Sequence, residues 1–422
     1  MRVIKSDIEN YLSDLKSRRV DLDLNQQVLS ILNTVKKEGD QSLYDFTERF
    51  DGVKLDALEV SNQAILDAFD RIDPPLLRSL KVARDNIQAY HKIQLRASQY
   101  LEIPGGRLGE IIRPLERVGI YVPGGKAAYP STVLMNALPA KLAGVDQVVM
   151  VTPPMKDGKV KDSVLVAAKL AGVDKIYAIG GAQAVAALTY GTESIEPVNK
   201  IVGPGNAYVA TAKGMVSGIV GIDMIAGPSE ILIMADQTSN PKYIAADMIS
   251  QAEHDEKAAA ITIIKGDERV DEILKELDSQ MNQSPRKEII KESLNNESAI
   301  LIVDSYEEMI DLANKIAPEH LEILTENSEK MLGGIKNAGA VFVGAYSPEP
   351  LGDYIAGPNH TLPTSGTAMF SSPLGIDDFI KKMSLIHYTK EGLENVKDDI
   401  VNIADDEGLF GHSNAIKIRF GG

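Results

Sequence analysis

The stretch DKIYAIGGAQAVAALTYG, from Asp174 to Gly191, decides the fold class. A short apolar run ends in two glycines, and a helix-like run of small residues follows at once. The same alternation continues on both sides: DQVVMVTPP (146–154) and NKIVGPG (199–205) are typical of strands, and DSVLVAAKLAG (162–172) and NAYVATAKGMVSG (206–218) of helices. Strands that alternate with helices predict a parallel sheet joined by right-handed crossovers.

A second series of the same kind follows, with strand-like runs such as SEILIMAD, AAAITIIKG and SAILIVDS. The first hundred or so residues have mostly helical spacing, and the end of the chain has one strand-like segment, SLIHYTK, and a charged helix. We therefore predict an α/β fold with two incomplete, Rossmann-like parallel-sheet domains, a helical N-terminal arm and a small C-terminal tail domain. The predicted boundaries are 1–20 for the arm, 119–229 for the glycine-loop domain, 21–118 with 230–374 for the larger domain, and 375–422 for the tail.

Composition restricts what the chain can do. It has 422 residues, and 60 Asp and Glu against 44 Lys and Arg give a net charge of −16. An acidic surface argues against broad contact with nucleic acid or an anionic membrane. The charged start and the lack of a membrane-length apolar run favour a cytoplasmic protein. The chain has no cysteine, so any metal must be held by nitrogen and oxygen ligands, and aldehyde chemistry cannot use a thiol.

Three predicted strand ends have glycine-containing loops: YVPGGKAAYPSTV (121–133), IGGAQAVAAL (179–188) and VGPGNAYVATA (202–212). In a parallel sheet, ligands bind beyond the carboxyl ends of the strands, where helix N-termini offer N–H groups to an anion. None of the loops is a G-x-G-x-x-G motif, and each by itself is also consistent with a tight turn. Together, the three loops favour a nucleotide site.

Four of the six histidines lie in polar surroundings, whereas His91 and His387 read as structural or surface residues. Gln251 and His254 are three residues apart near the end of a predicted helix, a spacing that suits two metal ligands on one face. Asp353 and His360 lie in a Gly/Pro-rich loop, and Glu407 and His412 flank glycines near the C-terminus. For each pair alone, a solvated helix end or a capping residue is an equally simple interpretation.

Glu319 and His320 are the most informative ionisable pair, because they interrupt the apolar run IAPEHLEIL (316–324). Two ionisable groups in such a run cost free energy unless they are paired or used. Pro318 places them between a predicted helix and a predicted strand, where side chains can reach a cleft. As sequence neighbours they point in different directions, so each can serve a separate proton transfer. A helix-capping His and a surface Glu are the structural alternative.

With these residues assembled, the chain resembles the histidinol dehydrogenase family nearly from end to end. The matching strings are RPLERVGIYVPGG, GPGNAYVA, GIDMIAGPSEILI, SQAEHD, IAPEHLEI, GDYIAGPNHTLPTSGTA and EGLFGHSNAI. The resemblance implies oxidation of L-histidinol to L-histidine through L-histidinaldehyde, the last steps of histidine biosynthesis, with two NAD+ and one bound Zn2+ per subunit. It also implies a homodimer in which the C-terminal tail completes the partner's site.

The resemblance assigns roles to particular residues. The implied zinc ligands are Gln251, His254, Asp353 and His412. The implied acid/base pair is Glu319 and His320. The implied substrate contacts are Ser229, Gln251, His254, His320, Asp353, His360, Glu407 and His412. The implied NAD contacts are Tyr121, Gln183 and Asn206.

This chemistry agrees with a chain that has no thiol. Oxidation of an alcohol to an acid needs two hydride transfers with a hydration between them, so water must attack the aldehyde. We expect Glu319 to activate that water, His320 to handle the protons of the alcohol and the hydrate, and zinc to orient the substrate. The competing interpretations are a two-lobed α/β protein that binds a small solute without chemistry, and a zinc hydrolase that uses the same ligands.

Overall fold

The computed structural model describes residues 1–6, 8–17, 22–124 and 128–421. The chain divides into two compact units, Met1–Gln94 with Leu115–Phe379 and Leu95–Pro114 with Ile380–Gly422. The first unit contains two parallel sheets with their helices, and the second contains an antiparallel sheet with two helices. The predicted α/β class with two parallel sheets is confirmed.

The first lobe of the larger unit is built on a five-stranded parallel sheet of order β6-β5-β4-β7-β8. Its strands are β4 (Arg117–Tyr121), β5 (Gln147–Val151), β6 (Lys175–Tyr177), β7 (Lys200–Val202) and β8 (Gly221–Ile222). The central strands are apolar along their length because helices cover both faces of the sheet. The alternation of strands and helices predicted from residue 146 onward is confirmed.

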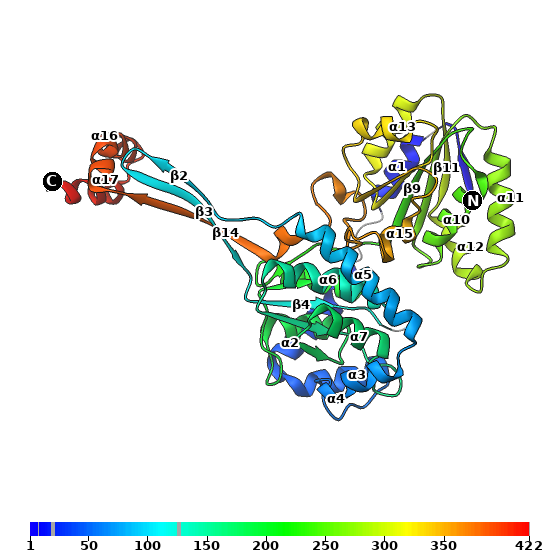
Figure 1. The fold of residues 1–422 in the computed structure, drawn as a ribbon, viewed down its shortest axis with the longest axis horizontal. Helices are drawn as coiled ribbons and strands as arrows, with labels where there is room; N and C mark the ends of the chain where they lie inside the picture. The colour runs from blue at the N-terminus through cyan, green and yellow to red at the C-terminus, as the bar shows by residue number, and fades with distance from the viewer. Residues whose placement is uncertain (7, 18–21, 125–127, 422) are drawn as a thin grey trace. The chain divides into compact units, whose positions relative to one another are not determined.

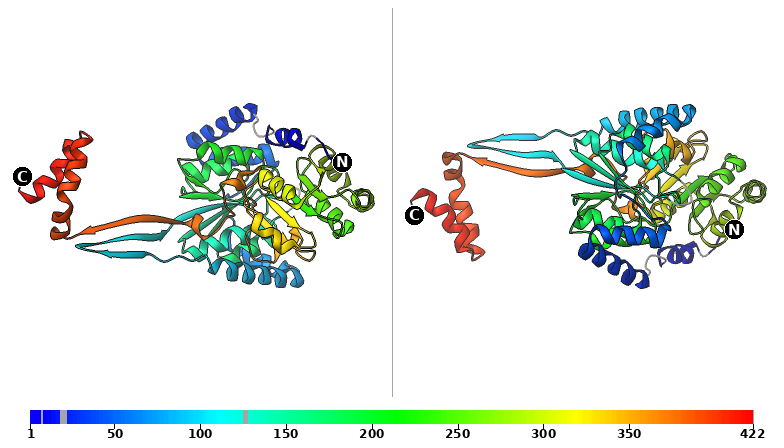
Figure 2. Two further views of the ribbon diagram at one scale, coloured as in Figure 1. Left: turned by 90° about the horizontal axis from the view of Figure 1, so that it is seen from above. Right: turned by 90° about the horizontal axis from the view of Figure 1, so that it is seen from below.

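Helices cover the two faces of this sheet, as Figures 1 and 2 show, and a hydrophobic core lies on each face. One core contains α4 (Asn62–Arg71), α5 (Pro74–Lys92), α6 (Pro130–Ala143) and α7 (Asp162–Ala171). The other contains α2 (Leu22–Glu38), α3 (Asp40–Asp51), α8 (Gly181–Tyr190) and α9 (Ala207–Val216).

The structure therefore differs from the predicted grouping of residues 21–118 with 230–374. Helices α2 to α5 pack on the five-stranded sheet, and Val28, Leu43 and Ile87 are buried there. An amphipathic helix has an apolar stripe that fits the face of any sheet, so the spacing of its residues predicts a helix but not its partner.

The second lobe of this unit is built on a six-stranded parallel sheet of order β1-β11-β10-β9-β12-β13. Its strands are β1 (Arg2–Ile4), β9 (Glu230–Ala235), β10 (Ala259–Lys265), β11 (Ala299–Val303), β12 (His320–Ile323) and β13 (Ala340–Val343). The N-terminal arm, expected to be helical, thus begins with a strand that pairs with β11. A three-residue strand is too short to show an alternating pattern in the sequence.

Helices cover both faces of this sheet as well. One face carries α10 (Pro241–Ala252), α11 (Val270–Met281) and α12 (Lys287–Asn296). The other carries α1 (Ile8–Ser17), α13 (Tyr306–Ile316) and the short α14 (Ser328–Met331). The remaining helical segments of this unit are η1 (Leu332–Gly334), α15 (Glu349–Tyr354), η2 (Thr367–Met369) and η3 (Ile376–Phe379).

Asp236 directly follows β9 and connects several segments at the carboxyl ends of the strands of the six-stranded sheet. Its carboxylate accepts hydrogen bonds from the Thr238 hydroxyl (2.5 Å), the Tyr306 hydroxyl (2.9 Å) and the Glu326 main-chain N–H (3.1 Å). These partners follow β9, β11 and β12, so one buried side chain ties together three strand ends.

The smaller unit consists of a three-stranded antiparallel sheet and two helices. The strands β2 (Gln99–Ile103), β3 (Gly106–Pro114) and β14 (Ile380–Tyr388) pair in the order β14-β3-β2. The helices are α16 (Lys390–Asp406) and α17 (Phe410–Lys417), followed by η4 (Ile418–Phe420). The predicted tail domain was thus incomplete, because β2 and β3 come from a part of the chain grouped with the larger domain. A single strand needs such partners to satisfy its main chain.

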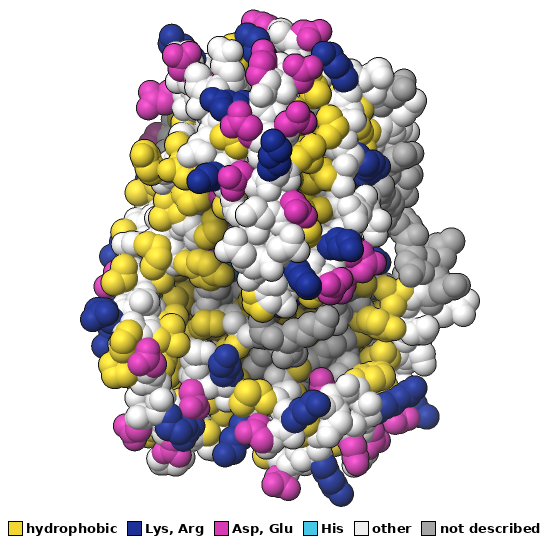
Figure 3. Space-filling view, turned by 90° about the vertical axis from the view of Figure 1, so that its right-hand side faces the viewer, with side chains coloured by type: hydrophobic (Ala, Val, Ile, Leu, Met, Phe, Trp, Pro, Cys, Tyr) yellow, Lys and Arg dark blue, Asp and Glu magenta, His cyan; other side chains and the backbone are white. Residues whose placement is uncertain are grey.

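The surface mixes charges of both signs. On the face drawn in Figure 3, Lys and Arg side chains are interspersed with Asp and Glu, with apolar side chains between them. Among the described residues, no helix combines the length and apolar character needed to cross a membrane.

Candidate active site

Glu319 and His320 follow a sharp turn of the chain and lie at the start of β12. Helix α13 ends at Ala317, whose φ of 51° is left-handed and whose N–H bonds the Ala313 carbonyl. Pro318 cannot continue the helix. Glu319 and His320 therefore lie at the amino ends of the strands of the six-stranded sheet. They are next to Glu230, the first residue of the neighbouring strand β9.

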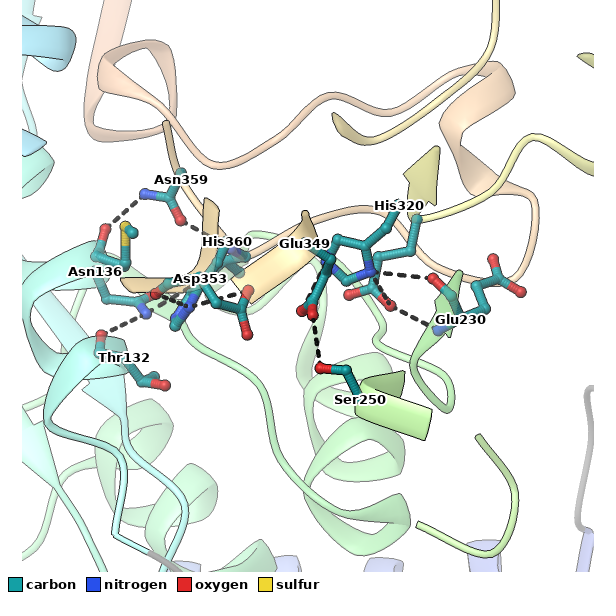
Figure 4. A network of polar contacts seen from close by, with 12 residues as sticks. Thr132, Asn136, Glu230, Ser250, His320, Glu349, Asp353, Asn359 and His360 are labelled. Atoms are coloured by element: carbon teal, nitrogen blue, oxygen red, sulfur yellow. Dashed lines mark hydrogen bonds and ion pairs between the residues drawn. The ribbon is translucent and has the colours of Figure 1, made fainter. Parts of the chain in front are cut away.

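Both side chains of the pair bind the main chain of Glu230, and Figure 4 shows the contact made by His320. The Glu319 Oε2 accepts the Glu230 N–H at 3.0 Å, and the His320 Nδ1 lies 3.0 Å from the Glu230 carbonyl oxygen. Because a carbonyl only accepts, Nδ1 carries the hydrogen and Nε2 is left with a free lone pair. Among the described residues, Nε2 has no hydrogen-bond partner.

The protonation of the pair follows from its burial. Desolvation raises the pKa of Glu319 well above its usual range and lowers the pKa of His320 to about 4. The two side chains approach to 3.8 Å, but a neutral imidazole does not form an ion pair with a carboxyl group. His320 therefore offers an uncharged Nε2 that can accept a proton at neutral pH.

The loop residues Asp353 and His360 lie next to this pair. The His360 Nδ1 bonds the Asp353 carbonyl oxygen at 3.1 Å and lies 3.7 Å from its carboxylate. Burial lowers the pKa of His360, so this imidazole is also held neutral. The expected grouping of Asp353, His360 and His320 in one polar cluster is visible in Figure 4.

Glu349 belongs to the same cluster, although the sequence reasoning did not select it. Ligand atoms of His320, Glu349 and Asp353 all lie within 4.8 Å of one another. Burial, together with the neighbouring Asp353 carboxylate, raises the pKa of Glu349 to about 9. Glu349 precedes Asp353 by four residues in α15, and this same-face helical spacing was the signal available in the sequence.

Helix α10 brings Gln251 and His254 toward this cluster. The helix begins at Pro241 after the N-cap Asn240, whose Oδ1 accepts the Lys242 N–H at 3.0 Å. Gln251 is fully buried, and neither polar atom of its amide has a partner among the described residues. His254 is exposed just beyond the helix end, and its proximity opposes protonation of both His320 and His360.

A polar seam anchors the loop that contains His360 to helix α6. The Asn359 amide donates to the Met135 carbonyl at 2.6 Å and accepts the Thr361 N–H at 2.9 Å. Asn136 donates to the Thr361 hydroxyl at 3.3 Å. His91, interpreted from the sequence as structural or surface, is fully buried beside Asn359 and therefore structural. This seam fixes the cluster loop of one lobe to a helix of the other (Figure 4).

The expected NAD contacts follow carboxyl ends of the five-stranded sheet. Tyr121 ends β4, and its hydroxyl accepts the Gly181 N–H at 3.0 Å. Gln183 is buried in α8 with no partner for its Oε1 among the described residues. Asn206 caps α9 by accepting the Val209 N–H at 3.2 Å and is exposed. Part of the first glycine loop, residues 125–127, lies outside the described residues.

Three further predicted residues are Ser229, Glu407 and His412. Ser229 is half-buried and directly precedes Glu230. Glu407 and His412 are exposed in the smaller unit, at the C-cap of α16 and in α17. Their place at a substrate or metal site stays a prediction.

A second pair of buried carboxyl groups, Asp247 and Glu322, lies next to Glu349 of this cluster. Glu322 is fully buried, and its Oε1 accepts the Glu349 N–H at 2.7 Å. Desolvation and the adjacent Asp247 raise the pKa of Glu322 well above its usual range, and desolvation raises the pKa of Asp247 to about 6. Two carboxyls that share a hydrogen bond must hold at least one proton. The sequence signal was Glu322, two residues after His320 in an apolar strand.

We expect Asp247→Asn to stabilise the protein at pH 8 and to leave its stability nearly unchanged at pH 4. The folded-state pKa of Asp247 is raised, so its contribution to stability is fully present below about pH 4 and is lost as the pH rises through about 6. Asparagine keeps the acceptor for Glu322 but cannot ionise. The expected gain at pH 8 is about 3 kcal/mol, measured by urea unfolding across this range.

The exposed Asp278→Asn on α11 serves as the control for loss of one negative charge. If the difference in the free energy of unfolding between Asp247→Asn and the parent stays constant from pH 4 to pH 8, Asp247 does not titrate in this range.

The fold and the site together describe a two-lobed α/β protein with a buried pair of ionisable side chains, Glu319 and His320, and glycine-containing loops after strands of its five-stranded sheet. Residues 15–420 match the model of the family described as histidinol dehydrogenase. The chain therefore belongs to the histidinol dehydrogenase family, which makes it an oxidoreductase acting on a CH–OH group.

Individual relatives agree with this assignment. The chain is 52% identical to the histidinol dehydrogenase of Clostridium acetobutylicum over 98% of this chain and 97% of that protein. It is 52% identical to the histidinol dehydrogenase of Listeria monocytogenes over 100% of this chain and 99% of that protein. The crystal structure of histidinol dehydrogenase from Elizabethkingia anophelis has a TM-score of 0.94 at 38% identity, covering 100% of this chain and 98% of that one. Family membership favours the dehydrogenase over the hydrolase and solute-binding alternatives.

Proposed function

We propose that this protein oxidises L-histidinol to L-histidine through L-histidinaldehyde, with two NAD+ and one zinc ion per subunit. The observation that supports this most directly is the pair Glu319 and His320. Both are buried, both are oriented by the Glu230 main chain, and a neutral His320 Nε2 is left free. Two oxidations separated by a hydration need two groups of this kind, held in place before substrate arrives.

The residues present fit a zinc ion and a dinucleotide. The candidate metal donors are nitrogen and oxygen atoms, and the buried amide of Gln251 has no protein partner among the described residues. A buried amide without a partner is costly unless a ligand satisfies it. The same holds for the Oε1 of the Gln183 amide, beside the glycine loops. We propose Gln251, His254 and Asp353 as ligands from one subunit, and Tyr121, Gln183 and Asn206 as NAD contacts.

When bound, NAD+ accepts hydride and zinc orients the substrate through its imidazole and amine nitrogens. His320 takes the hydroxyl proton of the alcohol at Nε2 as the hydride leaves the same carbon, which gives the aldehyde. Its Nδ1–H stays bonded to the Glu230 carbonyl, so the ring keeps its orientation while the proton moves. Ser229 and His360 are further proposed substrate contacts.

Glu319, in its ionised form, takes a proton from water as the water oxygen adds to the aldehyde carbon. Burial raises the pKa of this carboxyl, so its ionised form is a stronger base than an exposed carboxylate. His320 returns the alcohol's proton to the aldehyde oxygen, which gives the hydrate and leaves His320 neutral again. The hydrate then gives its hydroxyl proton to His320 and its hydride to the second NAD+, which leaves the acid. No residue of this chain needs to form a covalent bond to the substrate.

A stoichiometric assay tests the proposed function. The zinc-loaded protein is mixed with L-histidinol and NAD+, and NADH and histidine are measured together. Two NADH per histidine support the four-electron reaction. One NADH with accumulating aldehyde would mean that the hydration half does not occur. Turnover of a different alcohol, with none of histidinol, would contradict the substrate.

We also propose that the site is completed by the tail of a second copy, through Glu407 and His412. The smaller unit exposes large apolar side chains, and Ile403, Phe410 and Ile418 are each more than half exposed. Exposed apolar surface of this kind favours an interface. Mixing Glu319→Gln and His412→Ala subunits, each expected to form little histidine by itself, tests this with histidine formation as the readout. Recovered activity supports exchange of the tail, because one mixed site has both intact residues, whereas a tail acting within its own chain restores none.

A further inference from the structure

A buried ion pair in the five-stranded lobe is not used by the chemistry above. Lys213 on α9 pairs with Asp223, just after β8, and their side chains are only 2% and 1% exposed. A buried ion pair gains little net stability, because removing both charges from water offsets their attraction. Its presence therefore calls for another role.

The two side chains form hydrogen bonds with both main-chain polar groups of one residue, Gly203. The Lys213 Nζ donates to the Gly203 carbonyl oxygen at 2.9 Å, and the Asp223 Oδ2 accepts the Gly203 N–H at 2.8 Å. Gly203 has a φ of +109°, and a Cβ there would lie 2.2 Å from the Tyr121 carbonyl oxygen. The residue is thus fixed from one side by the ion pair and from the other by the end of β4.

Gly203 opens the loop that leads to Asn206, the N-cap of α9 and a proposed NAD contact. Tyr121, which Gly203 contacts, also accepts the Gly181 N–H at the start of α8. The contact between Gly203 and Tyr121 therefore links the loop that begins at Gly203 to the loop that contains Gly181. The Lys213 ammonium is neutralised by Asp223 and bonded to a carbonyl, so it is not available to a phosphate itself.

We propose that Lys213 and Asp223 are positioning residues that hold the 203–206 loop in the shape that receives the dinucleotide. This inference rests on the proposed function. It predicts that the pair controls affinity for NAD+ and NADH without contacting either, and that it leaves affinity for histidinol unchanged.

The test uses the double variant Lys213→Met with Asp223→Asn, because removal of one partner alone leaves an unpaired buried charge. NADH binding is measured by fluorescence titration, and the KM values for NAD+ and histidinol are measured separately. We expect the Kd for NADH and the KM for NAD+ to rise on the order of tenfold or more, with the KM for histidinol within about twofold of the parent.

Lys141→Met is the matched control. Lys141 lies in the same lobe, pairs with Asp174, and donates to the carbonyl oxygens of Val145 and Asp146 at the opposite edge of the sheet. We expect no change in NADH affinity for this variant. Circular dichroism spectra and melting curves establish that both variants are folded.

The outcomes separate the two levels of the proposal. A parent protein that binds NADH and a folded double variant that binds it equally well would overturn this inference alone. Equal rises in both KM values, or the same loss in Lys141→Met, would also overturn it, since they indicate a general disturbance of the lobe. A zinc-loaded parent that does not bind NADH would overturn the proposed function together with this inference.

Discussion

Glu319→Gln is expected to convert histidinol to histidinaldehyde at close to the parent rate and to form histidine on the order of 10²–10⁴ times more slowly. Glutamine keeps an oxygen that accepts the Glu230 N–H, so the local structure and the neighbouring His320 are preserved. It cannot take a proton from water. The aldehyde therefore forms, and its hydration fails.

The two half-reactions are measured separately, with histidinol and with added histidinaldehyde as substrates, by following NADH and histidine. The exposed Glu329→Gln in the same lobe is the control. Equal loss in both half-reactions would contradict a role for Glu319 in hydration alone, and would place this carboxyl in the first proton transfer as well.

His320→Asn is expected to slow both half-reactions, each on the order of 10²–10⁴. The asparagine amide can still donate to the Glu230 carbonyl, so the strand end is retained, but it has no basic nitrogen. The pH profile adds an independent readout. The pKa of His320 is lowered to about 4 by burial, so its neutral form, and with it the parent activity, is lost as the pH falls toward that value.

The residual activity of His320→Asn should not show that acidic limb. His387→Asn in β14 is the control, because His387 is exposed in the smaller unit. A variant with a normal rate, or one whose acidic limb is unchanged, would mean that another group accepts the alcohol proton.

Residue patterns predicted the parallel sheets because their strands are buried on both faces and separated by helices of small residues. They could not assign α2 to α5 to a sheet, since an apolar stripe does not identify its partner. They missed β1 because three residues give no period. In the smaller unit, β14 pairs with β3 across nearly 270 residues of sequence, Pro114 with Ile380. Antiparallel pairing over that separation leaves no local signal.

The same limits apply to the site. Glu319 and His320 were predictable because charge in an apolar run is costly unless it is used. Glu349 and Asp247 escaped notice because acidic residues on helices usually face water, and only the packed structure buries these two. The three-residue spacing from His254 indicated Gln251, and the resemblance assigned it as a metal ligand. Its buried and unpartnered amide gives a physical reason for that proposed role. No sequence pattern predicted that the Glu230 main chain would orient both members of the acid/base pair.

The hydrogen bonds of Asp236 have a practical consequence. They lie at the carboxyl ends of the strands of the six-stranded sheet, whereas Glu319 and His320 lie at the amino ends. The six residues of β9 therefore separate Asp236 from this pair by about 20 Å. Gln237, next to Asp236, has an exposed side chain. Because the chain contains no other thiol, Gln237→Cys would give a uniquely reactive attachment point for a dye, a spin label or a solid support. Turnover could then be followed on single immobilised molecules without touching the residues that perform it.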